Sequence, residues 1–256
     1  VTVPVAGASL WLDATDATSL VLSGSNVTTW NNKGTASVKL TGVNTASLTY
    51  NLSGGGLTNR AYVNLNGTNP SGTGLFNVQT LGGTNTSVAN GRTFFVVYAP
   101  TATPNQYTPL FGRTGTTGAY FNSGNNGSGY VDNTYGSTLS PNGGAVWYQN
   151  GLQIDALNEP INPATGLWRL NSVTTTAAYM FENLGKDRNL ANRNLPANIG
   201  EILVYDTPLT ASERASVEAY LSQKWMGQSP GYGTSGTLSS TSALSIGAGA
   251  TLDLAG

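Results

Sequence analysis

Short runs of alternating apolar and polar residues recur along the chain as far as Tyr205. This period-2 alternation predicts β-strands with one face toward a core and the other toward solvent. Clusters of Gly, Asn, Ser and Thr separate the runs and are typical of turns. Because all-β sandwiches commonly exceed about 200 residues as single units, we expect one large all-β domain. The predicted strands cover residues 9–13, 60–65, 93–99, 108–112, 119–121, 145–149, 152–154, 166–170, 178–181 and 199–205.

Five Asn-Gly pairs indicate where strands reverse direction. Asn and Gly adopt the positive φ angles that a type I′ hairpin turn requires. The strongest signal is Asn150-Gly151, because strand-like runs lie on both sides of it. We therefore predict a tight hairpin over residues 145–154. The other four pairs begin at Asn66, Asn90, Asn126 and Asn142.

One segment near the end of the chain has the pattern of an amphipathic helix. Thr210 and Glu213 match a capping box, in which each side chain accepts a hydrogen bond from the other residue's backbone amide. Gly227 follows as a natural stop. Apolar residues recur at helical spacing, so we predict a helix from Thr210 to Trp225 that packs on the sheets. The apolar positions are Val217, Tyr220, Leu221 and Trp225.

The composition changes after Gly227. Residues 228–236 resemble a linker, and residues 237–256 alternate small and apolar residues in groups about eight positions apart. Such spacing suits the rungs of a β-solenoid, which must stack on further rungs to bury an apolar face. The tail is also similar to the passenger repeats of autotransporter-like β-helical proteins. We therefore predict a domain at 1–227, a linker and solenoid-like tail at 228–256, and a longer parent protein.

Charge is scarce and balanced in this chain. Lys and Arg number 11 and Asp and Glu 12, so charged residues make up 9% of the chain, against about 25% in average proteins. So few cations cannot form the basic stripe that nucleic-acid binding needs, which excludes a nucleic-acid partner. No apolar run of about 18 residues is present, which argues against membrane insertion by this chain.

Three segments resemble LamG-like domains, members of the concanavalin A-like lectin/glucanase superfamily found in large secreted or surface-attached bacterial proteins. Residues 198–225 (NIGEILVYDTPLTASERASVEAYLSQKW) resemble the closing strand, turn and helix of these domains. LWLDA at 10–14 with VTTWNNKG at 27–34, and GLTNRAYVNLNG at 56–67, are similar to two earlier segments. The likeness covers about residues 8–226.

The resemblance implies a jelly-roll sandwich of two antiparallel sheets with the C-terminal helix packed on it. It also implies an extracellular or cell-surface location. Asn32 and Asn66 stand where the family often has Asp, which puts in doubt any cation that those carboxylates would hold. Because the superfamily includes sugar binders, hydrolases, lyases and spacer modules, the site residues must indicate the function.

Catalysis is disfavoured because the chain contains no His and no Cys. The usual general base, the Ser-His and Cys-His pairs and most zinc sites are therefore absent. Retaining glycoside hydrolases need two carboxylates about 5 Å apart. The five Glu residues do not form the Glu-x-Asp-x-x-Glu strand pattern of such enzymes on this fold. Only Glu182 and Glu201 are expected to be able to meet across strands.

A calcium ion is the cofactor that the composition favours, because carboxylate and amide oxygens are abundant. Asp13 and Asp16 lie close together in sequence at the end of a predicted strand, and Asp132 with Asn133 lies in a Gly-rich segment. The alternative is that these side chains form Asx turns.

Aromatic residues are dense in the Gly-rich stretch 120–148, which makes it the candidate glycan site. An aromatic ring can receive the apolar side of a sugar, while amides and carboxylates bind its hydroxyls. Alternatively, one of the two adjacent aromatics at 147 and 148 fills the core. The candidate ligand-binding residues are Tyr120, Tyr130, Asp132, Asn133, Tyr135, Trp147 and Tyr148. The tryptophans expected in the core are Trp11, Trp30, Trp168 and Trp225.

These observations favour a non-catalytic carbohydrate-binding or adhesive module of an extracellular bacterial protein. A glycan or polysaccharide is the expected partner, and a host or cell-surface protein is the other candidate. Two alternatives remain open: a glycoside hydrolase of jelly-roll fold with an atypical carboxylate pair, and a structural spacer domain.

Overall fold

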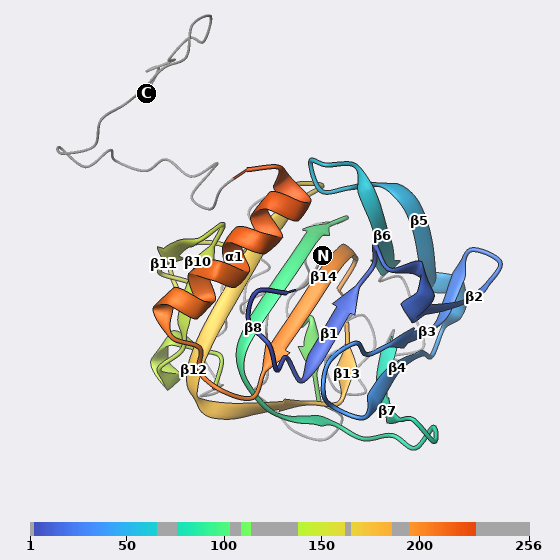
Figure 1. The fold of residues 1–256 in the computed structure, drawn as a ribbon, viewed down its shortest axis with the longest axis horizontal. Coiled ribbons are helices and arrows are strands. Elements are labelled where there is room, and N and C mark those ends of the chain that lie inside the picture. The colour runs from blue at the N-terminus through green and yellow to red at the C-terminus, as the bar shows by residue number, and fades with distance from the viewer. Residues whose placement is uncertain are drawn as a thin grey trace, which may run out of the picture.

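The computed structural model describes residues 3–65, 76–102, 109–113, 138–161, 165–185 and 195–228. This part of the chain is mostly antiparallel β-sheet with one C-terminal helix, which confirms the all-β class (Figure 1). The helix is α1 (Ala211–Met226). The strands are β1 (Leu10–Asp13), β2 (Leu20–Ser23), β3 (Asn26–Asn31), β4 (Val38–Gly42), β5 (Leu48–Gly55), β6 (Arg60–Leu65), β7 (Phe76–Thr80), β8 (Val88–Pro100), β9 (Phe111–Gly112), β10 (Val146–Gln149), β11 (Leu152–Ile154), β12 (Arg169–Phe181), β13 (Asn183–Leu184) and β14 (Ala197–Tyr205).

Hydrogen bonds join these strands into one 14-stranded sheet. Its order is β11-β10-β12-β8-β14-β6-β5-β3-β4-β7-β13-β9, with β1 on β14 and β2 on β3. The two separate sheets expected from the sequence are therefore not confirmed as such. The connection arises because β14 pairs along part of its length with β6 and along most of its length with β8.

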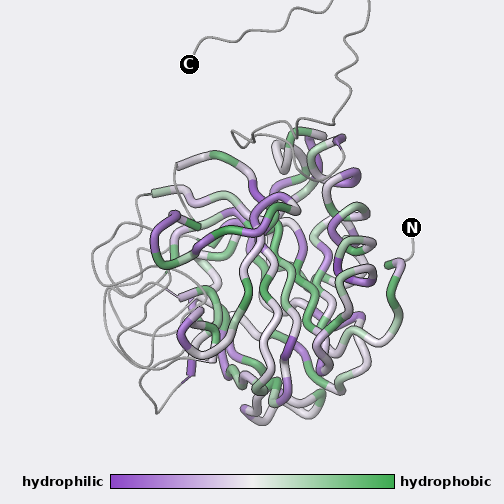
Figure 2. The backbone as a smooth tube through the Cα atoms, turned by 90° about the vertical axis from the view of Figure 1, so that its left-hand side faces the viewer, coloured by the Kyte–Doolittle hydropathy of each residue, from purple (hydrophilic) through white to green (hydrophobic). Residues whose placement is uncertain are grey.

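The sheet has two apolar faces, and successive side chains of β8 point alternately to one face and the other. Phe94, Val96 and Tyr98 point into the larger core, whereas Phe95 and Val97 point to a smaller one. The smaller core is covered by α1, which packs across β8 and β12 (Figure 1). Figure 2 shows hydrophobic positions gathered in the central strands. The strands at the centre of the sheet are thus buried on both sides, as their nearly continuous apolar sequence requires.

The predicted helix is confirmed together with its caps. Thr210 Oγ1 accepts a hydrogen bond from the Glu213 amide at 3.3 Å, and Glu213 Oε2 accepts one from the Thr210 amide at 2.9 Å. Gly227 ends the helix with φ of 68°, a left-handed conformation that glycine adopts without strain. Val217 and Leu221 are fully buried on its apolar face.

The predicted hairpin at Asn150-Gly151 is also confirmed. Both residues have positive φ, 51° and 84°, and they join β10 to β11. Asn90-Gly91, in contrast, lies inside β8 rather than in a turn. A Cβ at Gly91 would lie 2.4 Å from Phe94 Cζ, so this glycine is needed for close packing. Asn142-Gly143 falls in a short 3-10 helix, and the pairs at Asn66 and Asn126 lie outside the described residues.

Two of the predicted strands are parts of one longer strand. Residues 166–170 and 178–181 were expected to be separate, but β12 runs from Arg169 to Phe181 with a register shift between Thr174 and Tyr179. The predicted strand 119–121 and the tail 229–256 lie outside the described residues. Among the residues that the structure describes, no helix is both long enough and apolar enough to span a bilayer.

Candidate functional site

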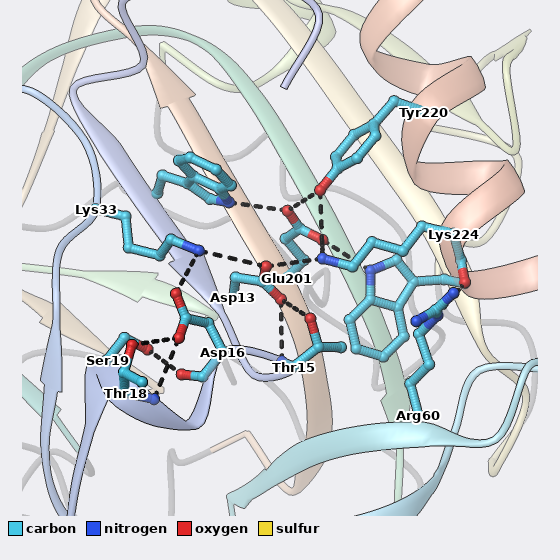
Figure 3. A network of polar contacts seen from close by, with 12 residues as sticks. Asp13, Thr15, Asp16, Thr18, Ser19, Lys33, Arg60, Glu201, Tyr220 and Lys224 are labelled. Atoms are coloured by element: carbon cyan, nitrogen blue, oxygen red, sulfur yellow. Dashed lines mark hydrogen bonds and ion pairs between the residues drawn. The ribbon is translucent and has the colours of Figure 1, made fainter. Parts of the chain in front are cut away.

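A cluster of charged side chains lies where β1, β14 and α1 meet (Figure 3). Asp13 and Glu201 face each other as register partners in the antiparallel pair β1–β14, so their side chains point to the same side of the sheet. The alternation places both on the side that packs against α1, together with Trp11. Lys224 projects toward them from the last turn of α1, and Lys33 approaches from the segment after β3.

Glu201 is fully buried and accepts four hydrogen bonds. Its Oε1 receives the Trp11 indole N–H at 2.9 Å and the Tyr220 hydroxyl at 3.0 Å. Its Oε2 receives Lys224 Nζ at 2.7 Å and the Trp225 indole N–H at 2.9 Å. Burial, helped by the negative charge of Asp13, raises the pKa of the Glu201 carboxyl despite the opposing effect of Lys224. A buried carboxyl held this way has a fixed position and no free lone pair facing outward.

Asp13 contacts both lysines, and one of them, Lys224, also contacts the Glu201 carboxyl. Its Oδ2 lies 2.8 Å from Lys224 Nζ and 3.6 Å from Lys33 Nζ. Its Oδ1 accepts hydrogen bonds from the Thr15 amide at 3.0 Å and the Thr15 hydroxyl at 2.7 Å. Burial alone would raise the pKa of Asp13, but the charge of Lys224 and these hydrogen bonds outweigh it and hold the pKa below its usual value.

Asp16 forms the outer part of the cluster. Its Oδ2 lies 2.7 Å from Lys33 Nζ, and its Oδ1 accepts hydrogen bonds from the amide and hydroxyl of Thr18. The hydrogen bonds from Lys33 and Thr18 lower the pKa of Asp16. The Lys33 ammonium also lies 4.2 Å from the centre of the Trp11 ring, a cation–π contact.

The candidate calcium ligands Asp13 and Asp16 do lie at one site, but lysines occupy their outward oxygens. The bonds from Asp13 to Thr15 and from Asp16 to Thr18 confirm the Asx-turn alternative for both residues. Within the described ranges, no group of three or more Asp, Glu, His or Cys side chains could hold a metal ion. A calcium ion here would have to displace Lys33. The other pair, Asp132 and Asn133, lies outside the described residues.

The end of α1 is fastened to the turn between β5 and β6, which fixes Lys224. The Lys224 carbonyl accepts the Arg60 Nε–H at 2.5 Å and the Thr58 hydroxyl at 2.8 Å. A Cβ at Gly56 would lie 2.1 Å from the Trp225 carbonyl oxygen, so only glycine allows this approach. Two elements distant in sequence thus hold the lysine from its backbone side.

A pocket of about 590 Å³ opens over the cluster. Arg60 and Gln223 complete its rim beside the ion pairs. Tyr220 contributes a half-buried ring, and burial beside Glu201 raises the pKa of its hydroxyl. The residues that line the pocket are Asp13, Thr15, Asp16, Lys33, Arg60, Tyr220, Gln223 and Lys224.

Of the predicted aromatic ligand site, only Trp147 and Tyr148 lie within the described residues; Tyr120, Tyr130, Asp132, Asn133 and Tyr135 lie outside them. Trp147 is 1% exposed, and its indole N–H donates to the Leu139 carbonyl at 2.8 Å, so it fills the core. It is nevertheless among the residues that line a pocket of about 390 Å³ beside the β10–β11 hairpin. Tyr148 is half-buried, and the Arg214 guanidinium covers its ring at 3.4 Å from the centroid.

The expected core positions of the other tryptophans are confirmed for Trp30 and Trp225, which are fully buried. Trp11 and Trp168 are partly buried and pack against the smaller core. Lys33 and Lys224 were not predicted as site residues. They lie in the segments 27–34 and 198–225, and nothing local in either segment indicates that the two lysines converge on Asp13.

The glutamates that were expected to be able to meet across strands lie in different surroundings. Glu201 lies beneath α1, whereas Glu182 lines a separate pocket of about 210 Å³ with Asn77 and Asn85. No hydrolase pair is therefore formed by these two carboxyls.

No protein-family model, no curated protein and no solved structure matches this chain.

Proposed function

We propose that this chain is a non-catalytic carbohydrate-binding module of an extracellular bacterial protein, and that it binds a glycan in the pocket between β1 and α1. The observation that carries the proposal is the pocket itself. Its volume of about 590 Å³ lies within the range of about 300–1,000 Å³ usual for small-ligand sites. Its lining comes from regular elements and short turns fixed by the ion pairs beneath them.

The chemistry of the lining favours a ligand rich in hydroxyl groups. Gln223 offers an exposed amide and Tyr220 a ring. The Thr15 and Tyr220 hydroxyls donate their protons to Asp13 and Glu201, so toward a sugar they can act as acceptors. The charges have mixed sign, because Lys33, Arg60 and Lys224 stand beside Asp13 and Asp16. A mixed lining binds hydroxyls as donor and acceptor without attracting a strongly charged polymer.

The proposal includes a jelly-roll-like sandwich as the scaffold. Strands from both ends of the hydrogen-bonded path contribute to a single large core: β10 and β12 from one end, β7, β9 and β13 from the other. A sheet that curves around one core in this way resembles a sandwich whose two halves remain joined.

The same geometry argues against a catalytic role for the cluster. Both oxygens of Glu201 are used by donors, and the outward oxygens of Asp13 and Asp16 face lysines. A general acid or a nucleophile needs an oxygen directed at the substrate. Calcium is not part of the proposal, because lysine ammonium groups already neutralise the two aspartates.

The test is binding to an array of neutral and acidic polysaccharides, followed by calorimetry of the best ligand. Gln223→Ala removes an exposed amide at the rim of the pocket, and we expect a loss of roughly threefold to tenfold in affinity, the equivalent of one hydrogen bond. Ser216→Ala, on an exposed part of the same helix, is the matched control and should leave the affinity unchanged. An array without binding above background would replace the proposal with a spacer or protein-adhesion role.

A further inference from the structure

The contacts of Lys224, Asp13 and Glu201 go beyond those of an ordinary surface ion pair. One amine lies within hydrogen-bond distance of two carboxyls, and the side chains are 10%, 7% and 0% exposed. We propose that Lys224 and Asp13 become joined by an intramolecular amide, an isopeptide bond, with Glu201 as the proton carrier. This inference does not depend on glycan binding.

The two reacting groups are held together before any reaction. Lys224 Nζ lies 2.8 Å from Asp13 Oδ2, so the amine already touches the carboxyl group that it would attack. Asp13 is fixed by its strand pairing and by Thr15, and Lys224 is fixed by the hydrogen bonds to its carbonyl. Such fixed contact replaces a bimolecular encounter and thereby lowers the barrier to amide formation between weakly reactive groups.

The two oxygens of Asp13 have different surroundings, and each suits a different role. Oδ1 accepts two hydrogen bonds from Thr15, which would polarise the carbonyl during attack and remain as partners of the amide oxygen. Oδ2 faces Lys224 and, at 3.6 Å, the ammonium of Lys33. Positive charge beside Oδ2 stabilises it as the leaving oxygen.

The step balances without any co-reactant. Nζ forms a bond to Cγ of Asp13, and the bond from Cγ to Oδ2 breaks. The ammonium gives up two protons, and Oδ2 leaves with them as water, so that one positive and one negative charge disappear. Glu201 Oε2, 2.7 Å from Nζ, accepts the proton that the amine must lose before attack and returns it toward the leaving oxygen.

Burial at Glu201 suits its part as the proton carrier, although Lys224 favours the charged form of Asp13 before the reaction. Glu201 lies among the indole rings of Trp11 and Trp225 and the ring of Tyr220, where charge is poorly solvated. Burial raises the pKa of the Glu201 carboxyl, which suits a group that must take up a proton. Removing a charged pair from such a site removes the cost of keeping it out of water.

The bond would connect the first strand in the chain to the last turn of the only α-helix among the described residues. Asp13 ends β1 and Lys224 lies near the end of α1, so the closed loop contains almost the whole described domain. A cross-link across so long a loop restricts the unfolded chain strongly. In a module of a surface protein, it would also keep a pulling force on either end from peeling off β1 or α1.

The test is the mass of the full 256-residue chain measured under denaturing conditions, with tandem mass spectrometry of a digest. We expect the mass to be lower than the sequence mass by one water molecule, and a branched peptide that joins the segment around Asp13 to the segment around Lys224. Lys224→Arg and Glu201→Gln should both have the full sequence mass. Glu218 is a buried carboxyl on α1 that pairs with Arg214, so Glu218→Gln serves as the control and should keep the loss of water.

Asp13→Asn provides the sharpest variant, because an asparagine would form the same amide by losing ammonia. Its product should therefore have the same mass as the linked wild-type chain. This variant keeps the proposal testable even if Glu201→Gln does not fold. A wild-type mass equal to the sequence mass after folding at neutral pH would overturn the proposal. That result would leave the glycan test untouched, because the pocket does not need the bond.

Discussion

At the scale of single residues, the site shows how a chain with few charges can concentrate them. Glu201 is buried because four donors from β1 and α1 converge on it, and removal of any one would leave a buried carboxyl partly unpaired. Asp13 and Asp16 are neutralised by Lys33 and Lys224. The electrostatics of the pocket therefore depend on two lysines that lie far apart in sequence.

The contacts of Asp16 lead to a prediction about how the stability of the fold depends on pH. Its pKa lies below the unfolded value of about 3.9, because Lys33 and Thr18 bind the charged form. A lowered pKa stabilises the folded state above the unfolded pKa, and this stabilisation is lost as the pH falls through the folded pKa. We expect Asp16→Asn to lower the midpoint of thermal unfolding at about pH 6 but to have little effect at about pH 2.

Thermal unfolding followed by circular dichroism at several pH values measures this difference. Asp206→Asn, at an exposed aspartate that forms no ion pair with the described residues, is the matched control and should cause a smaller change. A constant difference between Asp16→Asn and wild type at all pH values would contradict the assigned role of the Asp16 charge.

At the scale of elements, local chemistry explains those that the sequence predicted well. The capping box of Thr210 and Glu213 and the positive φ angles of Asn150-Gly151 involve residues close in sequence, so their pattern is visible without a fold. The strands β2 to β5 and β7 were largely missed. In β3, β4 and β7 the less buried positions carry Thr, Asn, Gln and Lys, and Thr and Asn are also common in the turns of this chain; β2 and β5 expose the apolar residues Val21, Leu22 and Leu52, which breaks the expected alternation.

The N-terminal cap of α1 leads to a prediction about the free energy of unfolding. Thr210→Ala removes the hydroxyl that accepts the Glu213 amide, and we expect a loss of about 1 kcal/mol in the free energy of unfolding. Chemical denaturation measures it. Ser216→Ala on the exposed face of the same helix should be neutral or slightly stabilising, because alanine is the better helix former. Equal effects of the two substitutions would contradict the capping role.

The site itself was only partly predictable. Asp13 and Asp16 were identified because acidic residues at the end of a strand are visible in sequence, and calcium was predicted for them. In the structure, the ammonium groups of Lys33 and Lys224 lie beside their carboxylates. Lys33 and Lys224 reach them only through the sheet order and the packing of α1 on the sheet. Glu201 was predicted only as a strand residue able to meet Glu182, and its four donors come from β1 and α1 instead. Contacts of such long sequence separation leave no periodic signal.

At the scale of the whole molecule, the sheet and the helix bring the beginning and the end of the domain to one place. β1 pairs with β14, and the turn between β5 and β6 holds the end of α1. The pocket lies at this junction. A ligand bound there would contact the first strand and the last helix together and would therefore stabilise the folded state as a whole.

The most direct test of the proposed function is a titration of isotope-labelled protein with the best polysaccharide fragment from the array, followed by amide chemical shifts. We predict that the largest shifts fall on residues that line the pocket, including Thr15, Lys33 and Gln223. They should be weaker in Gln223→Ala. Shifts centred on the β10–β11 hairpin instead, or no shift with any glycan tested, would contradict carbohydrate binding at the junction of β1 and α1.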